Sequence, residues 1–145
     1  MKSKLPLEAE LEPLFLRKLP PMPFNVKDGF VQVMPWIALI NGILGIVRLI
    51  KVYSDSYAIS YGVTTEATFS LLATAVTSIL SLLAFTSLRA NRRRGWNFLY
   101  FAVLISTVLN LLSGVLDFGI GEILFTLLFS TFELWVLFNI RERYW

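Results

Sequence analysis

Glu133 is the residue whose type and position most strongly suggest chemistry, because it lies several residues inside a long apolar run. An ionised side chain costs roughly 2.5–3.5 kcal/mol at the middle of a membrane-spanning helix, so a carboxylate there needs a partner or a function. Arg48 and Glu122 lie in similar runs, nearer to the ends, and Asn41 and Asn110 add amides inside apolar runs. These five residues are our candidates for a functional polar site.

Small and polar residues recur at helical spacing in four apolar runs, so that each run presents one such face. The sets are Asn41, Gly45 and Arg48; Ser70, Thr74, Thr77 and Ser81; Ser106, Asn110, Gly114 and Asp117; and Glu122, Thr126, Ser130 and Glu133. We favour the interpretation that these faces are helix contacts, since small residues allow close approach and hydroxyls and amides form hydrogen bonds between helices. The alternative is a route or pocket for an ion, a proton or a polar solute, with Glu133 as the titrating group.

Depth within the runs predicts which charged groups meet. Arg48 and Glu122 both lie toward the same end, so we expect an ion pair between them. Glu133 lies nearer the opposite end, where Gln32, a hydroxyl such as that of Ser81, or an arginine from the polar connection would be its partner.

The chain contains no cysteine and no histidine. This excludes disulfides, thiol chemistry, histidine-bound metals and histidine acid-base catalysis. No run resembles a dedicated oxygen-ligand loop, so we expect no metal and no cofactor. We expect a protein that is not an enzyme; lipid chemistry by Asp117, Glu122 and Glu133 is a third and weaker hypothesis, because it needs a metal or base that the sequence does not provide.

Composition and segment length define the elements that carry these residues. The chain is 56% hydrophobic and only 16% charged, against about 25% charged in typical soluble domains. Apolar runs at about 30–53, 64–88, 96–116 and 120–140 are each long enough for a helix to cross a ~30 Å hydrocarbon core. The sequence therefore predicts an all-α, integral membrane four-helix bundle over 30–145, built from two antiparallel helical hairpins. The connection at 117–119 is short enough for a tight turn.

Residues 1–29 form a separate N-terminal segment rich in proline and lacking the pattern of a cleavable signal peptide. Leu7, Leu11, Leu14 and Phe15 recur at helical spacing, and prolines at 20, 21 and 23 stop any helix. Two interpretations remain open: a short amphipathic interfacial helix followed by an extended linker, or a partly ordered tail.

The basic residues predict orientation. All of the 13 Lys and Arg residues except Arg48 and Lys51 fall on one side of the predicted bundle, which by the positive-inside rule is cytoplasmic. We therefore expect both termini in the cytoplasm of a bacterium, with the spans in its cytoplasmic membrane. The topology signal is strongest in Arg89, Arg92, Arg93 and Arg94, which we also expect to contact anionic lipids. The basic residues flank apolar runs and form no extended face for nucleic acid.

The proline-rich LPPMPFNVKD followed by PWIALINGILGI, covering residues 19–46, resembles the start of small uncharacterised bacterial four-span membrane proteins, including those of candidate-phyla genomes. The resemblance implies the four-span fold and carries over no active site. The chain is also similar in length to small multidrug transporters, yet the run at 30–53 lacks their first-span glutamate.

Two functional hypotheses follow. The first is a small structural, assembly or accessory subunit that acts through helix–helix and lipid contacts, as a homo-oligomer or within a membrane complex. The second is a small transporter or channel for an ion or polar solute that uses intramembrane Glu133. A hydrated cavity inside a single bundle would favour the second hypothesis.

Overall fold

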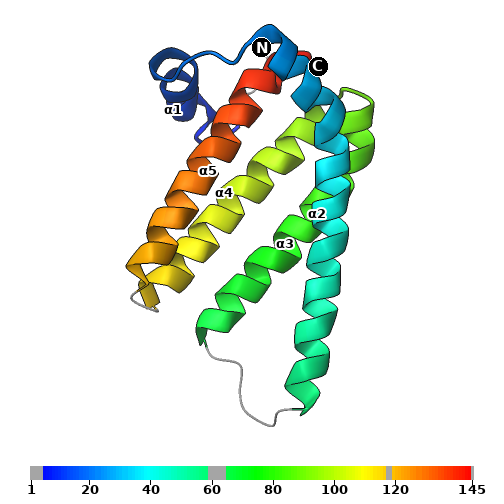
Figure 1. Ribbon diagram of the computed structural model, residues 1–145, viewed down its shortest axis with the longest axis vertical. Helices are drawn as coiled ribbons and strands as arrows, with labels where there is room; N and C mark the ends of the chain where they lie inside the picture. The colour runs from blue at the N-terminus through cyan, green and yellow to red at the C-terminus, as the bar shows by residue number, and fades with distance from the viewer. Residues whose placement is uncertain (1–4, 59–64, 117–118, 145) are drawn as a thin grey trace.

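The computed structural model describes residues 5–58, 65–116 and 119–144, and within these ranges the chain forms helices and no strand (Figure 1). Four long helices make up the body of the molecule: α2 (Phe24–Ala58), α3 (Thr65–Arg89), α4 (Arg93–Leu116) and α5 (Ile120–Ile140). A short helix α1 (Glu8–Pro13) and a π-helical turn η1 (Leu14–Lys18) precede them, and a 3-10 turn η2 (Arg141–Arg143) follows α5.

The four long helices are long and apolar enough to cross a membrane, which is consistent with an integral membrane protein. Their bounds agree with the predicted runs except in α2, which extends beyond its predicted run at both ends, to Phe24 and to Ala58. That helix begins at Phe24, so our segment boundary at 29/30 falls inside it and Pro35 occupies its interior. The helix starts early because Pro23 can open it: the N–H groups of Val26 and Lys27 both donate to the Pro23 carbonyl.

Consecutive helices run antiparallel and pack side by side, with the most extensive contact between α3 and α4 (Figure 1). The turn that joins this pair has Asn91 in the left-handed region, at φ 50°. The N–H of Arg92 donates to the Ser87 carbonyl and that of Asn91 to the Leu88 carbonyl, which is the hydrogen-bond pattern of a Schellman motif. The turn therefore reverses the chain within a few residues.

Glycines allow the helix backbones to approach closely. A Cβ added at Gly95 of α4 would lie 2.6 Å from the backbone N of Leu88 in α3. A Cβ at Gly45 of α2 would lie 1.9 Å from the Ser78 hydroxyl of α3. These are the close contacts through small residues that hold membrane helices together. By contrast, α2 and α5 contact each other much less than either contacts its chain neighbour.

The buried core lies at the end of the bundle where the N-terminal segment, the α3–α4 turn and the C-terminal residues gather (Figure 1). Trp96 and Tyr100 of α4 stack on each other, and Phe15 of η1 stacks on Phe138 of α5. Elsewhere large apolar side chains point outward, among them Leu128, which is 72% exposed. An apolar exterior with a small aromatic core suits a lipid environment.

Candidate functional site

A cleft of about 660 Å³ lies between the four long helices. Its wall is mostly apolar, and every one of the four helices also contributes polar side chains to it. The polar lining consists of Asn41 and Arg48 from α2; Ser70, Thr74, Thr77, Ser78 and Ser81 from α3; Ser106 and Asn110 from α4; and Thr126, Ser130 and Glu133 from α5. The structure thus brings the polar faces of the four helices together around one space.

Most hydroxyls of the cleft are bonded within the bundle. Thr74 and Ser78 donate to carbonyls one turn earlier in α3, as Thr77 also does. Thr107 of α4 donates to the Ser130 hydroxyl of α5 at 2.7 Å, which is a hydrogen bond between two helices. A hydroxyl that already donates its one O–H needs no further acceptor, so it tolerates an apolar setting and still offers lone pairs to the cleft.

The two charged residues of the cleft differ from its hydroxyls, because they have no bonding partner among the described residues. Arg48 and Glu133 both line it, and neither forms a hydrogen bond or an ion pair within the part of the chain that the structure describes. Glu122 does not line the cleft; its carboxylate lies beside Gly119 at the start of α5. The predicted ion pair between Arg48 and Glu122 is therefore not formed, because the two helices that carry them scarcely touch.

The chain matches no protein-family model, no curated protein and no solved structure. Its function is therefore inferred from its own side chains. Of the five candidate residues, Asn41, Arg48, Asn110 and Glu133 share the cleft, whereas Glu122 lies outside it. Asp117, the last member of the third polar set, lies outside the described residues.

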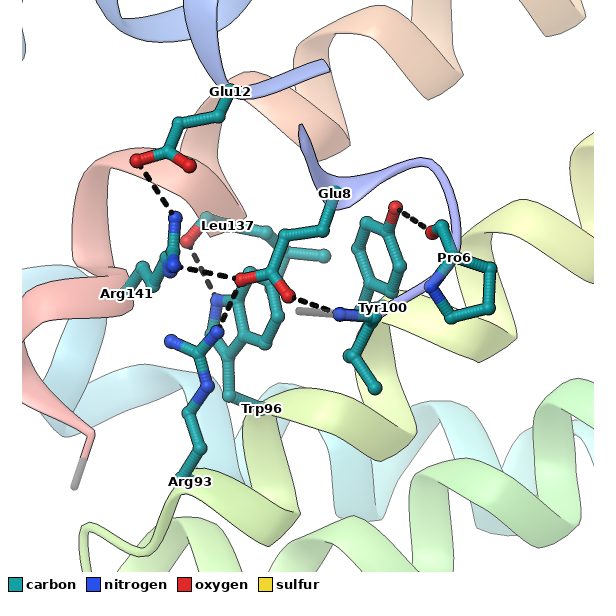
Figure 2. A network of polar contacts seen from close by, with 9 residues as sticks. Pro6, Glu8, Glu12, Arg93, Trp96, Tyr100, Leu137 and Arg141 are labelled. Atoms are coloured by element: carbon teal, nitrogen blue, oxygen red, sulfur yellow. Dashed lines mark hydrogen bonds and ion pairs between the residues drawn. The ribbon is translucent and has the colours of Figure 1, made fainter. Parts of the chain in front are cut away.

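A second polar cluster, which sequence reasoning missed, centres on Glu8 of α1. Glu8 is only 1% exposed and forms ion pairs with Arg93 and with Arg141, the latter at 2.8 Å (Figure 2). Its other carboxylate oxygen accepts the N–H of Leu5 at 2.7 Å, and Arg141 also contacts Glu12 at 3.2 Å. Because Arg93 is the first residue of α4, at the positive end of the helix dipole, a carboxylate there compensates two positive charges at once.

Hydrogen bonds from the bundle fix the N-terminal segment beside this cluster. The Tyr100 hydroxyl donates to the Pro6 carbonyl at 2.8 Å (Figure 2). The indole N–H of Trp135 donates to the Pro20 carbonyl, and Asn139 accepts the backbone N–H of Met22 at 3.0 Å. Of the two interpretations left open, the structure has the short helix with its extended proline segment, and both are packed against α4 and α5.

The helical spacing of the apolar residues in this segment suggests that they share one environment. The structure places them in different environments. Phe15 is buried against Phe138, whereas Leu7 and Leu14 are exposed. Glu8 occupies the inner face instead, since two arginines are available to pair with it there. One sequence signal could have located the cluster. Glu8 and Glu12 have a spacing of four, which places them on one helical face, and arginines lie at the start of the third span and at the end of the fourth.

The four arginines that we grouped as lipid contacts are not equivalent. Arg93 is committed to Glu8 and stacks over the Trp96 ring at 4.2 Å. Arg89, Arg92 and Arg94 are exposed, with Arg89 beside Trp36 and Arg94 beside Phe98. Among the described residues no group of three or more acids lies close enough to hold a metal ion.

Proposed function

We propose that this chain is a small integral membrane protein of the transporter or channel class, which binds an ion or a polar solute in the cleft between α2, α3, α4 and α5. The observation that carries the proposal is the lining of that cleft: polar side chains from all four helices, with Glu133 and Arg48 left unpaired among the described residues. Intramembrane ionisable residues that face a cavity are characteristic of solute and ion pathways.

The energetics favour a filled cleft. An unpaired charge that faces hydrocarbon at mid-helix would cost roughly 2.5–3.5 kcal/mol on insertion scales, and access of water or a solute through the cleft removes that cost. The volume of about 660 Å³ lies within the range of ligand sites and equals that of about 20 waters at ~30 Å³ each. A seam that served only to pack helices would be filled by side chains and would leave no such space.

The weak contact between α2 and α5 favours a second candidate, the accessory subunit, in which a partner helix or another copy covers the cleft from the side. A helix about 10 Å across with a rise of 1.5 Å fills about 120 Å³ per residue, so the cleft holds fewer than two turns. A partner would therefore close the mouth of the cleft and leave most of the space to a smaller occupant.

The orientation belongs to the same proposal. We place the end with the arginine-rich turn and both termini in the cytoplasm, in a bacterial cytoplasmic membrane, because basic residues concentrate there. Exposed Arg92 and Arg94 would then contact anionic lipid headgroups, at about 1 kcal/mol each near a charged leaflet.

Cysteine labelling tests whether water enters the cleft. The chain has no cysteine of its own, so single-cysteine variants give a clean signal. Thr126 lines the cleft and Leu128, two residues along α5, points away from it. In proteoliposomes we expect Thr126→Cys to react with a membrane-impermeant thiosulfonate and Leu128→Cys to stay unmodified.

Equal protection of both variants would contradict a hydrated cleft. Protection that disappears when the protein is diluted in detergent would instead support the accessory-subunit candidate, since a partner would be covering the mouth.

For transport, we expect an ion or proton flux in proteoliposomes that Glu133→Gln abolishes and Glu122→Gln retains, because only Glu133 lines the cleft. Equal fluxes in the two variants would remove Glu133 from the pathway.

A further inference from the structure

The cleft carries two separate charges of opposite sign. Among the described residues, Arg48 is its one cation and Glu133 its one carboxylate. The helix contacts give their relative depth. Gly45 lies opposite Ser78, Leu88 opposite Gly95, and Thr107 bonds Ser130. Following this antiparallel register, Glu133 lies level with about residue 44 of α2, so Arg48 is about four residues, or about 6 Å, further along the axis.

The wall of the cleft combines apolar residues, such as Leu44 of α2 and Phe129 of α5, with hydroxyl groups such as that of Ser130. Neither charged side chain, exposed Arg48 or half-buried Glu133, has a partner in the described chain, so an occupant that carried only one charge would leave the other group unpaired. A water-filled cleft would solvate both groups; a solute that displaces the water must replace those interactions at both ends.

We infer that the occupant of the cleft is a zwitterionic solute, whose carboxylate binds Arg48 and whose ammonium group binds Glu133. This inference rests on the proposed function, because it names the class of solute that the cleft takes. An arginine guanidinium holds a carboxylate through two parallel hydrogen bonds, and a carboxylate is the natural acceptor for an ammonium group. The complex is then electrically neutral, and both charged side chains of the cleft have a partner.

A series of linear ω-amino acids measures both the charge preference and the separation. γ-Aminobutyrate, ε-aminocaproate and ω-aminocaprylate have the same two ends at increasing distance. Calorimetric titration of the purified full chain in an uncharged detergent should show one preferred length. At that length, the matched acid without the amine and the matched amine without the acid should each bind at least about tenfold more weakly, or about 1.4 kcal/mol.

Variants that remove one charge at a time identify which side chain binds the carboxylate of the solute and which binds its ammonium group. Glu133→Gln should lower the affinity for the zwitterion to that for the matched acid and leave the affinity for the acid unchanged. Arg48→Gln should have the mirror effect and leave the affinity for the amine unchanged. Glu122→Gln, a change of the same chemistry on α5 outside the cleft, should bind as the unmodified protein does, and Arg48→Lys should keep the preference for a zwitterion.

The inference is overturned if the matched acid binds as tightly as the zwitterion, or if neither neutralisation alters the preference. It is also overturned if no member of the series binds while Thr126→Cys reacts with the impermeant reagent; in that case the hydrated cleft, and with it the proposed function, stands. Protection of Thr126→Cys together with an absence of binding removes both.

Discussion

Glu8 and Glu133 are both acids in largely apolar surroundings, yet the fold treats them in opposite ways. Glu8 is enclosed by Arg93 and Arg141 and accepts a backbone N–H, so its charge is fully compensated (Figure 2). Glu133 faces a cleft with no partner in the described chain. A compensated charge suits a structural role, whereas an uncompensated one suits the binding of something that the protein alone does not contain.

Removal of the charge on Glu8 is expected to destabilise the fold. Glu8→Gln leaves Arg93 and Arg141 without their shared carboxylate and should lower the free energy of unfolding by about 2 kcal/mol, because bonds to charged groups are the stronger class. Thermal unfolding in an uncharged detergent measures the change. Glu10→Gln, on the exposed side of the same helix, is the control and should shift stability by no more than about 0.5 kcal/mol. Equal effects of the two changes would contradict the structural role of Glu8.

At the scale of the helices, the polar faces serve two purposes that sequence periodicity does not separate. Gly45 and Ser78 allow α2 and α3 to touch, as expected of a helix contact. Asn41, Arg48 and Asn110 belong to the same predicted faces and line open space instead. Residues of one predicted face therefore divide between a helix contact and the wall of a cleft, because only part of that face touches the neighbouring helix.

Two glycine substitutions with opposite signs test the helix contacts. Gly95→Ala would press a methyl group against the backbone of Leu88 and should destabilise by about 1–3 kcal/mol. Gly121→Ala in α5 meets nothing within 4 Å, so its better helix propensity should stabilise by roughly 0.5–1 kcal/mol. Unfolding temperatures of the two purified variants would be compared with that of the unmodified chain. A stabilising Gly95→Ala would show that α3 and α4 do not approach as closely as described.

For the molecule as a whole, the two ends of the bundle differ in character. The N-terminal segment, the α3–α4 turn and the C-terminal residues meet at one end (Figure 1). There, ion pairs join Arg93 and Arg141 to Glu8, and Arg143 to Asp28. These contacts hold three separate parts of the chain together. The cleft extends away from this closed end, between α2 and α5, which have little mutual contact.

Our orientation predicts which residues a reagent reaches from each side of a membrane. Asn91, in the turn at the closed end, and Ile120, at the other end of the bundle, are both exposed. In intact cells, Ile120→Cys should react with an impermeant thiol reagent, whereas Asn91→Cys should react only after the membrane is made permeable. Labelling of both from one side would contradict four crossings of the membrane, and the reverse pattern would invert the orientation.

The four long helices, their approximate bounds and the polar face of each could be predicted from the sequence, because hydropathy and helical periodicity are local properties that each segment carries by itself. The sequence also determined that the basic residues gather at one end, since antiparallel helices alternate direction. Only the tertiary structure decided that Glu8 pairs with Arg93 and Arg141, that Arg48 and Glu122 stay apart, and that four polar faces enclose a cleft. These outcomes depend on how closely α2 and α5 approach and on where a segment 85 residues away along the chain comes to rest. The approach of these helices and the position of that segment depend on packing over the whole bundle. A local sequence pattern contains no information about such packing.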